Sequence, residues 1–118
     1  IGNETEIKKP AAFDKEVSVG EKSVVGPYVV LGRNVTVGKN VRIQNSVILR
    51  ETVISDFVSM DGAIIGEGVF IGKRVKIGKG CILGDHVKIK DDTSLAERVL
   101  ICPAKEISES VLTPKCIT

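Results

Sequence analysis

An aliphatic residue followed by glycine recurs every six residues along much of this 118-residue chain. The pairs fall into two runs: Val19-Gly20, Val25-Gly26, Leu31-Gly32 and Val37-Gly38, then Ile65-Gly66, Ile71-Gly72, Ile77-Gly78 and Leu83-Gly84. A six-residue period is typical of a parallel β-helix, in which three hexapeptides make one coil. The repeat therefore predicts an all-β fold, a single-stranded parallel β-helix, with a short strand at each repeat.

The residues between the glycines support this assignment. If the aliphatic residue is position i, then position i+4 is also small or apolar, so each strand points in, out and in again from i+4 to the next i. Cys81 occupies one of these inward positions, and we expect it to be a core residue. Position i+3 carries residue types that tolerate a positive φ. Its clearest members are Asn34, Asn40, Gly68, Arg74, Gly80, His86 and Asp92.

Two breaks in the period fix the register of the coils. The steps from Ile43 to Ile48 and from Met60 to Ile65 are five residues long instead of six. With three repeats to a coil, both short units begin in the same column, so they are expected to stack on each other and to preserve the register of the strands. The three predicted columns begin Ile1, Val19, Val37, Ile54; Ile7, Val25, Ile43, Met60; and Phe13, Leu31, Ile48, Ile65. About five coils result.

The pattern weakens after Ile89, where charged residues and Pro103 replace the glycine corners. We therefore divide the chain into a hexapeptide-repeat β-helix over residues 1–94 and a last partial coil with a capping tail over residues 95–118. Covering the open end of a parallel stack limits edge-to-edge association.

One outward face of the predicted helix is apolar along its whole length. A continuous apolar stripe on the surface of a domain usually marks an interface. We expect it to contact another subunit or another domain of the same protein; the alternative is cover by the chain's own Val111 and Leu112, or partial exposure. Val53 and Phe70 form a second, smaller candidate contact. The predicted interface residues are Ala12, Val30, Val47, Ile64, Ile82 and Leu100.

Charge and cysteine content narrow the possible partners. The net charge of +2 is too small to favour nucleic acid or an anionic membrane as a partner, and no apolar run is long enough to span a bilayer. The three cysteines do not form a disulfide framework, which fits a reducing cytoplasm. No Cys-x-x-Cys pair is present and His86 is the one histidine, so no zinc motif is expected.

Candidate catalytic groups are few. Hexapeptide-repeat acyltransferases use a histidine as general base with acyl-coenzyme A bound between subunits, which makes His86 the only candidate catalytic residue. Because His86 belongs to a corner series in which Asn, Gly and Arg also occur, we expect a solvated corner instead. Asp56 and Asp61 flank the short units without a third converging group. A basic strip for phosphates is a further alternative, with Arg33, Lys39, Arg42, Lys73, Arg74, Lys76 and Lys79 as its members.

The order of these pieces resembles a known family. The glycine repeats, then Val41 to Leu49, then Thr52-Val53-Ile54, then Ala63-Ile64-Ile65-Gly66 look like the C-terminal domain of sugar-1-phosphate nucleotidylyltransferases, closest to mannose-1-phosphate guanylyltransferase. The segment Pro103 to Ile107 resembles a family segment with Pro-His-Lys, although Ala104 stands where that segment has histidine. The resemblance covers nearly the whole chain.

The resemblance implies a left-handed β-helix and a role in oligomerisation or regulation. In that family the nucleotide-binding glycine-rich signature and the magnesium-binding aspartates lie in a preceding domain, and neither motif occurs in this sequence. The parent would join a nucleoside triphosphate to a sugar 1-phosphate and release pyrophosphate with magnesium. The implied partners are further copies of the chain and an N-terminal nucleotidyltransferase domain. The alternative function is an acyltransferase that uses acetyl-coenzyme A with His86 as base.

Overall fold

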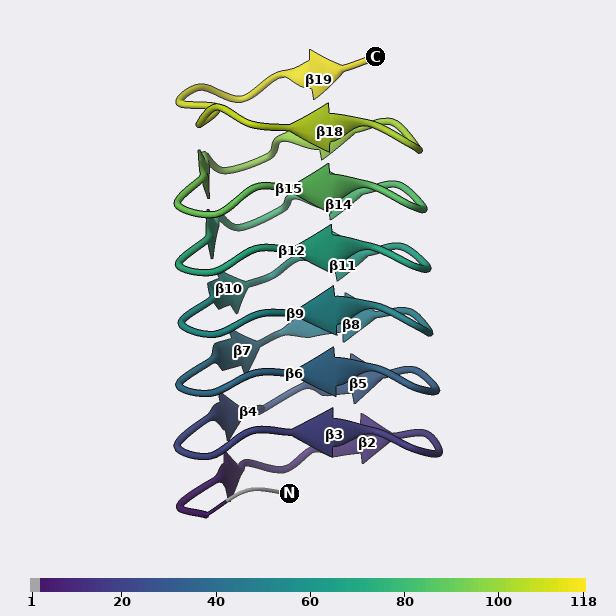
Figure 1. Cartoon of the computed structure of the whole chain (residues 1–118), viewed down its shortest axis with the longest axis vertical. Coiled ribbons are helices and arrows are strands. Elements are labelled where there is room, and N and C mark those ends of the chain that lie inside the picture. The colour runs from purple at the N-terminus through teal and green to yellow at the C-terminus, as the bar shows by residue number, and fades with distance from the viewer. Residues whose placement is uncertain (1–2) are drawn as a thin grey trace.

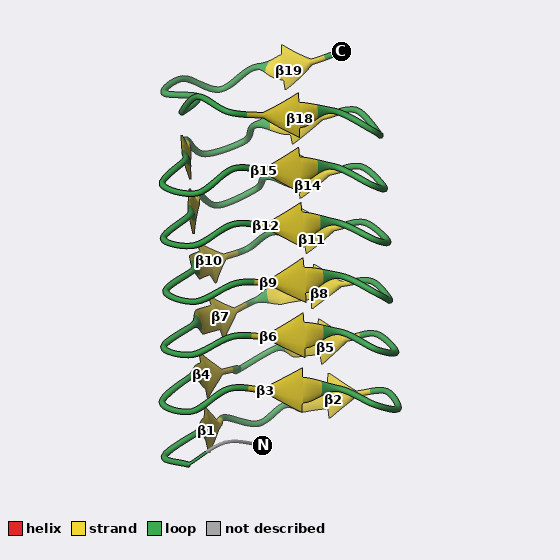
Figure 2. Cartoon of the chain, in the orientation of Figure 1, coloured by secondary structure: helices red, strands yellow, loops and turns green. Residues whose placement is uncertain are grey.

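The chain folds into a left-handed parallel β-helix, shown by a computed structural model that describes residues 3–118 (Figure 1). The described residues form strands and loops and no helix (Figure 2). The molecule measures 36 × 21 × 21 Å, with the long dimension along the stack. The predicted fold class is confirmed. Ile1, the first residue of the first predicted column, lies outside the described residues.

Within residues 3–118, nineteen short strands form three parallel sheets, one on each side of the coil. The first sheet contains β1 (Glu6–Ile7), β4 (Val24–Val25), β7 (Arg42–Gln44), β10 (Ser59–Asp61), β13 (Lys76–Ile77) and β16 (Ser94–Leu95). The second contains β2 (Ala11–Phe13), β5 (Val29–Leu31), β8 (Ser46–Ile48), β11 (Ile64–Ile65), β14 (Ile82–Leu83), β17 (Leu100–Ile101) and β19 (Cys116–Ile117). The third contains β3 (Ser18–Val19), β6 (Thr36–Val37), β9 (Val53–Ile54), β12 (Phe70–Ile71), β15 (Lys88–Ile89) and β18 (Glu106–Ile107).

The strands pair in the predicted register. Ile43 in β7 lies between Val25 in β4 and Met60 in β10, and Ile48 in β8 lies opposite Ile65 in β11. The two five-residue units therefore stack on each other, as predicted. The aliphatic residues at position i, and most residues at position i+4, point inward from all three sheets and form one continuous core.

The helix continues beyond the region of clear glycine repeats. Strands β16, β17 and β18 pair with the strands below them, so the chain makes about six coils, and β19 begins another. We number these coils 1 to 6, each with one strand from each sheet in chain order. Val111 bridges to Leu95 and is largely buried, which covers the end of the core. The division at residues 94 and 95 stays a prediction.

The corners have the backbone geometry that their residue types indicate. All seven residues predicted at positive φ adopt it, with φ between 55° and 76°. The glycine that follows each aliphatic residue often serves a different purpose, which is close approach of the next coil. A Cβ at Gly66 would lie 2.6 Å from Oδ1 of Asp85, and that oxygen accepts a hydrogen bond from the Glu67 amide at 2.9 Å. Asp56 and Asp91 make the same contact over Gly38 and Gly72.

Small polar side chains at the inward i+4 position bond to corner carbonyls of the next coil. Ser23 Oγ donates to the Gly38 carbonyl at 2.8 Å, and Thr52 Oγ1 donates to the Gly66 carbonyl at 2.9 Å. Thr93 occupies the same position in coil 6, but its buried hydroxyl has no hydrogen-bond partner among the described residues. An unsatisfied buried hydroxyl is destabilising, because it has lost its bonds to water.

Replacement of Thr93 by valine, which has nearly the same shape, should therefore raise the free energy of unfolding by about 1 kcal/mol. The matched change Thr52→Val should lower it by about 1 kcal/mol, since it removes a satisfied hydroxyl. Urea denaturation of both variants measures the two effects. A destabilised Thr93→Val protein would show that this hydroxyl has a partner.

Candidate functional site

The outer face of the second sheet carries an unbroken column of aliphatic side chains, which we call the apolar column. Parallel pairing places each member directly above the previous one, at the middle of the in-out-in pattern. Its five larger members are between 37% and 48% exposed. The column consists of Ala12, Val30, Val47, Ile64, Ile82 and Leu100.

Two further exposed side chains widen the apolar surface in coils 2 and 3. Leu49 follows β8 at a position where the coils below and above have Gly32 and Gly66, so it projects between two flat glycine sites. Tyr28 lies at the corner before β5, is 64% exposed, and lines a shallow apolar hollow with Ala12 and Val30. Neither Leu49 nor Tyr28 is among the predicted interface residues. The signal for Leu49 is present, however, because a leucine interrupts the glycine positions of its column.

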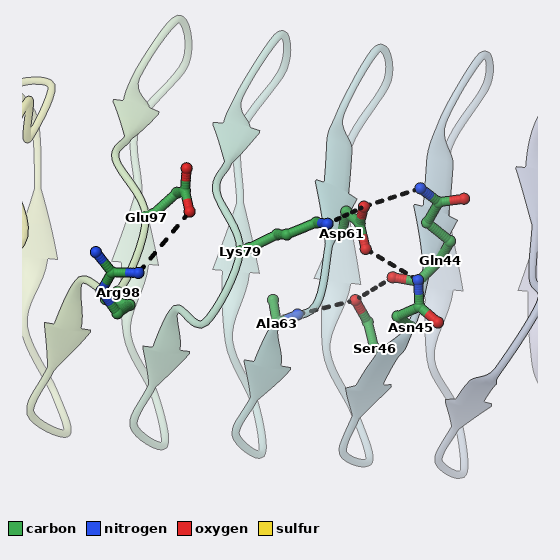
Figure 3. Close-up of polar contacts among 8 residues, drawn as sticks. All are labelled: Gln44, Asn45, Ser46, Asp61, Ala63, Lys79, Glu97 and Arg98. Carbon is green, nitrogen blue, oxygen red and sulfur yellow. Dashed lines mark hydrogen bonds and ion pairs between the residues drawn. The ribbon is translucent and has the colours of Figure 1, made fainter.

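The outer face of the second sheet borders the first sheet at the two short corners, which connect β7 to β8 and β10 to β11. Asp61 forms hydrogen bonds that link these corners. Its carboxylate accepts hydrogen bonds from Gln44 Nε2 at 2.9 Å and from Asn45 Nδ2 at 3.1 Å (Figure 3). Lys79 Nζ in the next coil lies 3.9 Å away. The bonds from Asn45 and Gln44 lower the pKa of Asp61, and the charge of Lys79 adds to this effect. Asp61 thus links coils 3, 4 and 5.

Because its pKa is lowered in the folded protein, Asp61 should stabilise the fold while it is ionised. This contribution is present above the ordinary pKa of aspartate and is lost as the pH falls through the lowered value. Asp61→Ala should reduce the free energy of unfolding by about 1–2 kcal/mol at pH 7, which is the effect of losing hydrogen bonds to a charged group. The deficit should shrink in acid.

Denaturation curves across pH test this expectation, with Glu109→Ala, which removes an exposed carboxylate of the C-terminal segment, as the control. A deficit that is equal at neutral and acid pH would show that the charge of Asp61 does not act in this way.

His86 lies at the corner between the second and third sheets, in coil 5. A Cβ at Gly68 would be 2.7 Å from His86 Nδ1, so the imidazole packs over that glycine in the coil below. Arg50 and Glu67 lie beside it and pair with each other, Nε to Oε1, at 3.2 Å. Within the described part of the chain, the ring makes no hydrogen bond that would orient it as a base. The geometry therefore gives His86 no partner for proton transfer, and its role stays a prediction.

The remaining charged candidates are dispersed. Asp56 lies at the corner before the first sheet and Asp61 at the corner after it, and each has its own structural partners. The basic residues proposed as a strip occupy different corners and sheets, and three of them form ion pairs. These pairs are Lys39 with Glu21, Arg74 with Asp92, and Lys79 with Asp61.

Residues 3–118 contain no cluster of three or more His, Cys, Asp or Glu side chains that could hold a metal ion. The magnesium implied by the family resemblance therefore finds no matching ligand set among them. Cys81 is buried and its Sγ donates to the Ala96 carbonyl at 3.0 Å, and burial raises the pKa of this thiol. It is a core residue, as predicted. Over the same residues, no helix is long and apolar enough to cross a membrane.

Fold and surface together define a class of protein, the hexapeptide-repeat left-handed β-helix domains. Within this class, the family model described as the GMPPB C-terminal domain matches residues 7–117. The chain belongs to this family. The match confirms the resemblance to the C-terminal domain of sugar-1-phosphate nucleotidylyltransferases. A comparison with curated protein sequences finds no match.

Solved structures with the same fold include several acetyltransferases. The acetyltransferase domain of PglB from Neisseria gonorrhoeae has a TM-score of 0.59 at 17% identity, and the match covers 95% of this chain and 53% of that one. A variant of GDP-perosamine N-acetyltransferase from Caulobacter crescentus, in complex with CoA and GDP-perosamine, has a TM-score of 0.56 at 13% identity over 95% of this chain and 51% of that one. This chain thus spans about half the length of those structures. At these identities the likeness concerns the fold.

Proposed function

We propose that this domain holds copies of a sugar-1-phosphate nucleotidylyltransferase together through the apolar column. The parent protein would convert a nucleoside triphosphate and a sugar 1-phosphate into a nucleoside diphosphate sugar and pyrophosphate. That chemistry, with its magnesium, would take place in an N-terminal nucleotidyltransferase domain. The family match to a C-terminal domain supports this division of labour. The three free thiols support a cytoplasmic location for the parent.

The observation that carries the proposal is the exposed apolar column itself. Six aliphatic side chains form a continuous stripe from β2 to β17, whereas the outward positions of the first sheet are mostly polar or charged. Apolar surface gains about 25 cal/mol for each Å² removed from water, so a partner that covers the stripe gains substantial free energy. The third sheet is apolar outside only at Val53 and Phe70, a smaller contact area.

Acyl transfer from acetyl-coenzyme A with His86 as base is the alternative, and it has less support. His86 is exposed, and its neighbours Arg50 and Glu67 are paired with each other. The neighbouring acetyltransferase structures share the fold at 13% and 17% identity, which does not extend to their activity.

Two glutamates introduced at neighbouring positions of the apolar column should abolish assembly. Val47 and Ile64 are direct neighbours on β8 and β11, so Val47→Glu with Ile64→Glu would place two carboxylates at the middle of the column. We expect the wild-type domain to sediment as an oligomer and the double variant to sediment as a monomer.

Ser18→Glu with Thr36→Glu is the matched control, since these exposed residues are direct neighbours on β3 and β6 of the third sheet. This variant should remain an oligomer. A wild-type monomer, or equal dissociation of both double variants, would contradict the proposed role of the column.

A further inference from the structure

We infer that two copies of this domain pack antiparallel across their second sheets, so that coil 1 of one copy faces coil 6 of the other. Coil 2 then faces coil 5, and coil 3 faces coil 4. The inference rests on the proposed function, because it uses the same apolar column, and it adds the partner's orientation and the contacts that select it.

The sizes of the side chains in the apolar column favour this orientation. The lower three members are the small residues Ala12, Val30 and Val47, and the upper three are the larger residues Ile64, Ile82 and Leu100. In the antiparallel arrangement each small residue meets a large one of the partner, so the two surfaces stay evenly spaced. In a parallel arrangement alanine meets alanine at one end and leucine meets leucine at the other. The surfaces would then diverge, which close packing disfavours.

The charges along the edge next to the third sheet point to the same orientation. At the same corner position, coils 1 to 3 carry Lys15, Arg33 and Arg50, whereas coils 4 and 5 carry Glu67 and Asp85. Antiparallel packing brings the Arg50–Glu67 ion pair of one copy opposite the same pair of the other, so that each arginine faces the partner's glutamate, and it brings Arg33 opposite the partner's Asp85. In a parallel dimer with its two-fold axis along this edge, each coil would meet the same coil of the partner. Like charges would then face each other, and like charges suppress association.

The opposite edge, next to the first sheet, also offers two complementary contacts. Lys9 in coil 1 and Glu97 in coil 6 occupy the same corner position, and both are exposed. Antiparallel packing places Lys9 opposite the partner's Glu97, and it places Tyr28 in coil 2 opposite the partner's Lys79. A cation beside an aromatic ring is a favourable contact.

The two short corners mark the centre of this arrangement. They lie in coils 3 and 4, with two full-length corners of this edge below them and two above. A two-fold axis between coils 3 and 4 would pass between them, next to the network around Asp61 (Figure 3). Each of these corners is one residue shorter than the others of this edge, so the edge protrudes least at the centre of the proposed dimer.

The dimensions of the face are compatible with a specific dimer. With the 36 Å length and 21 Å width of the molecule, it offers at most about 750 Å² on each copy, or about 1,500 Å² in total, which lies within the range of stable protein interfaces.

Charge reversal at Lys9 and Glu97 tests the orientation. Within one chain these residues are about 24 Å apart along the stack, five strand spacings, so they cannot pair with each other. Lys9→Glu or Glu97→Lys should each weaken dimerisation of the domain about tenfold in sedimentation equilibrium at low salt, since each change makes two contacts repulsive. The double variant should return to within about threefold of the wild type, because both contacts are restored with their signs exchanged.

The controls are the single variants Lys22→Glu and Glu109→Lys, which reverse charges in the same two coils but at the corner away from the second sheet. Each should leave the dimer unchanged, and thermal melts should show that all variants are folded. A wild-type monomer would contradict the proposed function itself. A dimer that tolerates both single reversals, a double variant that stays weak, or a trimer would overturn the antiparallel orientation while leaving assembly through the column in place.

Discussion

The structure depends on the parallel ladder between successive coils. Each strand pairs with the strand one coil away, 18 residues along the chain for Val25 and Ile43 and 17 for Ile43 and Met60. Because every coil is held only by its neighbours, each corner must deliver the chain to the next strand in register. The backbone approaches so closely after β11 that a side chain at Gly66 would collide with the Asp85 carboxylate. Glycine, and the aspartate that reaches over it, keep the coils at strand spacing.

This register is also what creates the apolar column. When the ladder stacks residue on residue, whatever occurs at one outward position is repeated as a column along the face. On the second sheet the column is aliphatic, and the charges at its edge next to the third sheet change sign near the middle of the stack. The same short corners that keep the strands in register lie at that midpoint. The fold and the proposed assembly surface therefore share one set of constraints.

Much of this could be predicted from the sequence, because periodicity and register are properties of the residues in order. The columns followed from the two five-residue steps, and the positive φ values at Asn34 and His86 followed from residue type and position. The predicted number of about five coils is close to the observed six, but the last coil gives a weaker signal, since its corners at Arg98 and Ala104 adopt positive φ without glycine, asparagine, aspartate or histidine. The roles of Asp61 and Asp85 could not be predicted, because in sequence a carboxylate that caps a neighbouring coil looks like any solvated turn residue.

The most direct test of the antiparallel dimer is the distance between identical labels on its two copies, measured for labels in successive coils. Spin labels at Ser18, Thr36 and Val53, one at a time and with Cys102 and Cys116 changed to serine, would report coils 1, 2 and 3 from outward positions of the third sheet. In the antiparallel dimer, the offset between labels along the stack should fall from about 24 Å to about 14 Å and then to about 5 Å. Dipolar distances that shorten in this order would support the account. Equal distances at all three positions, or no dipolar coupling at all, would contradict it.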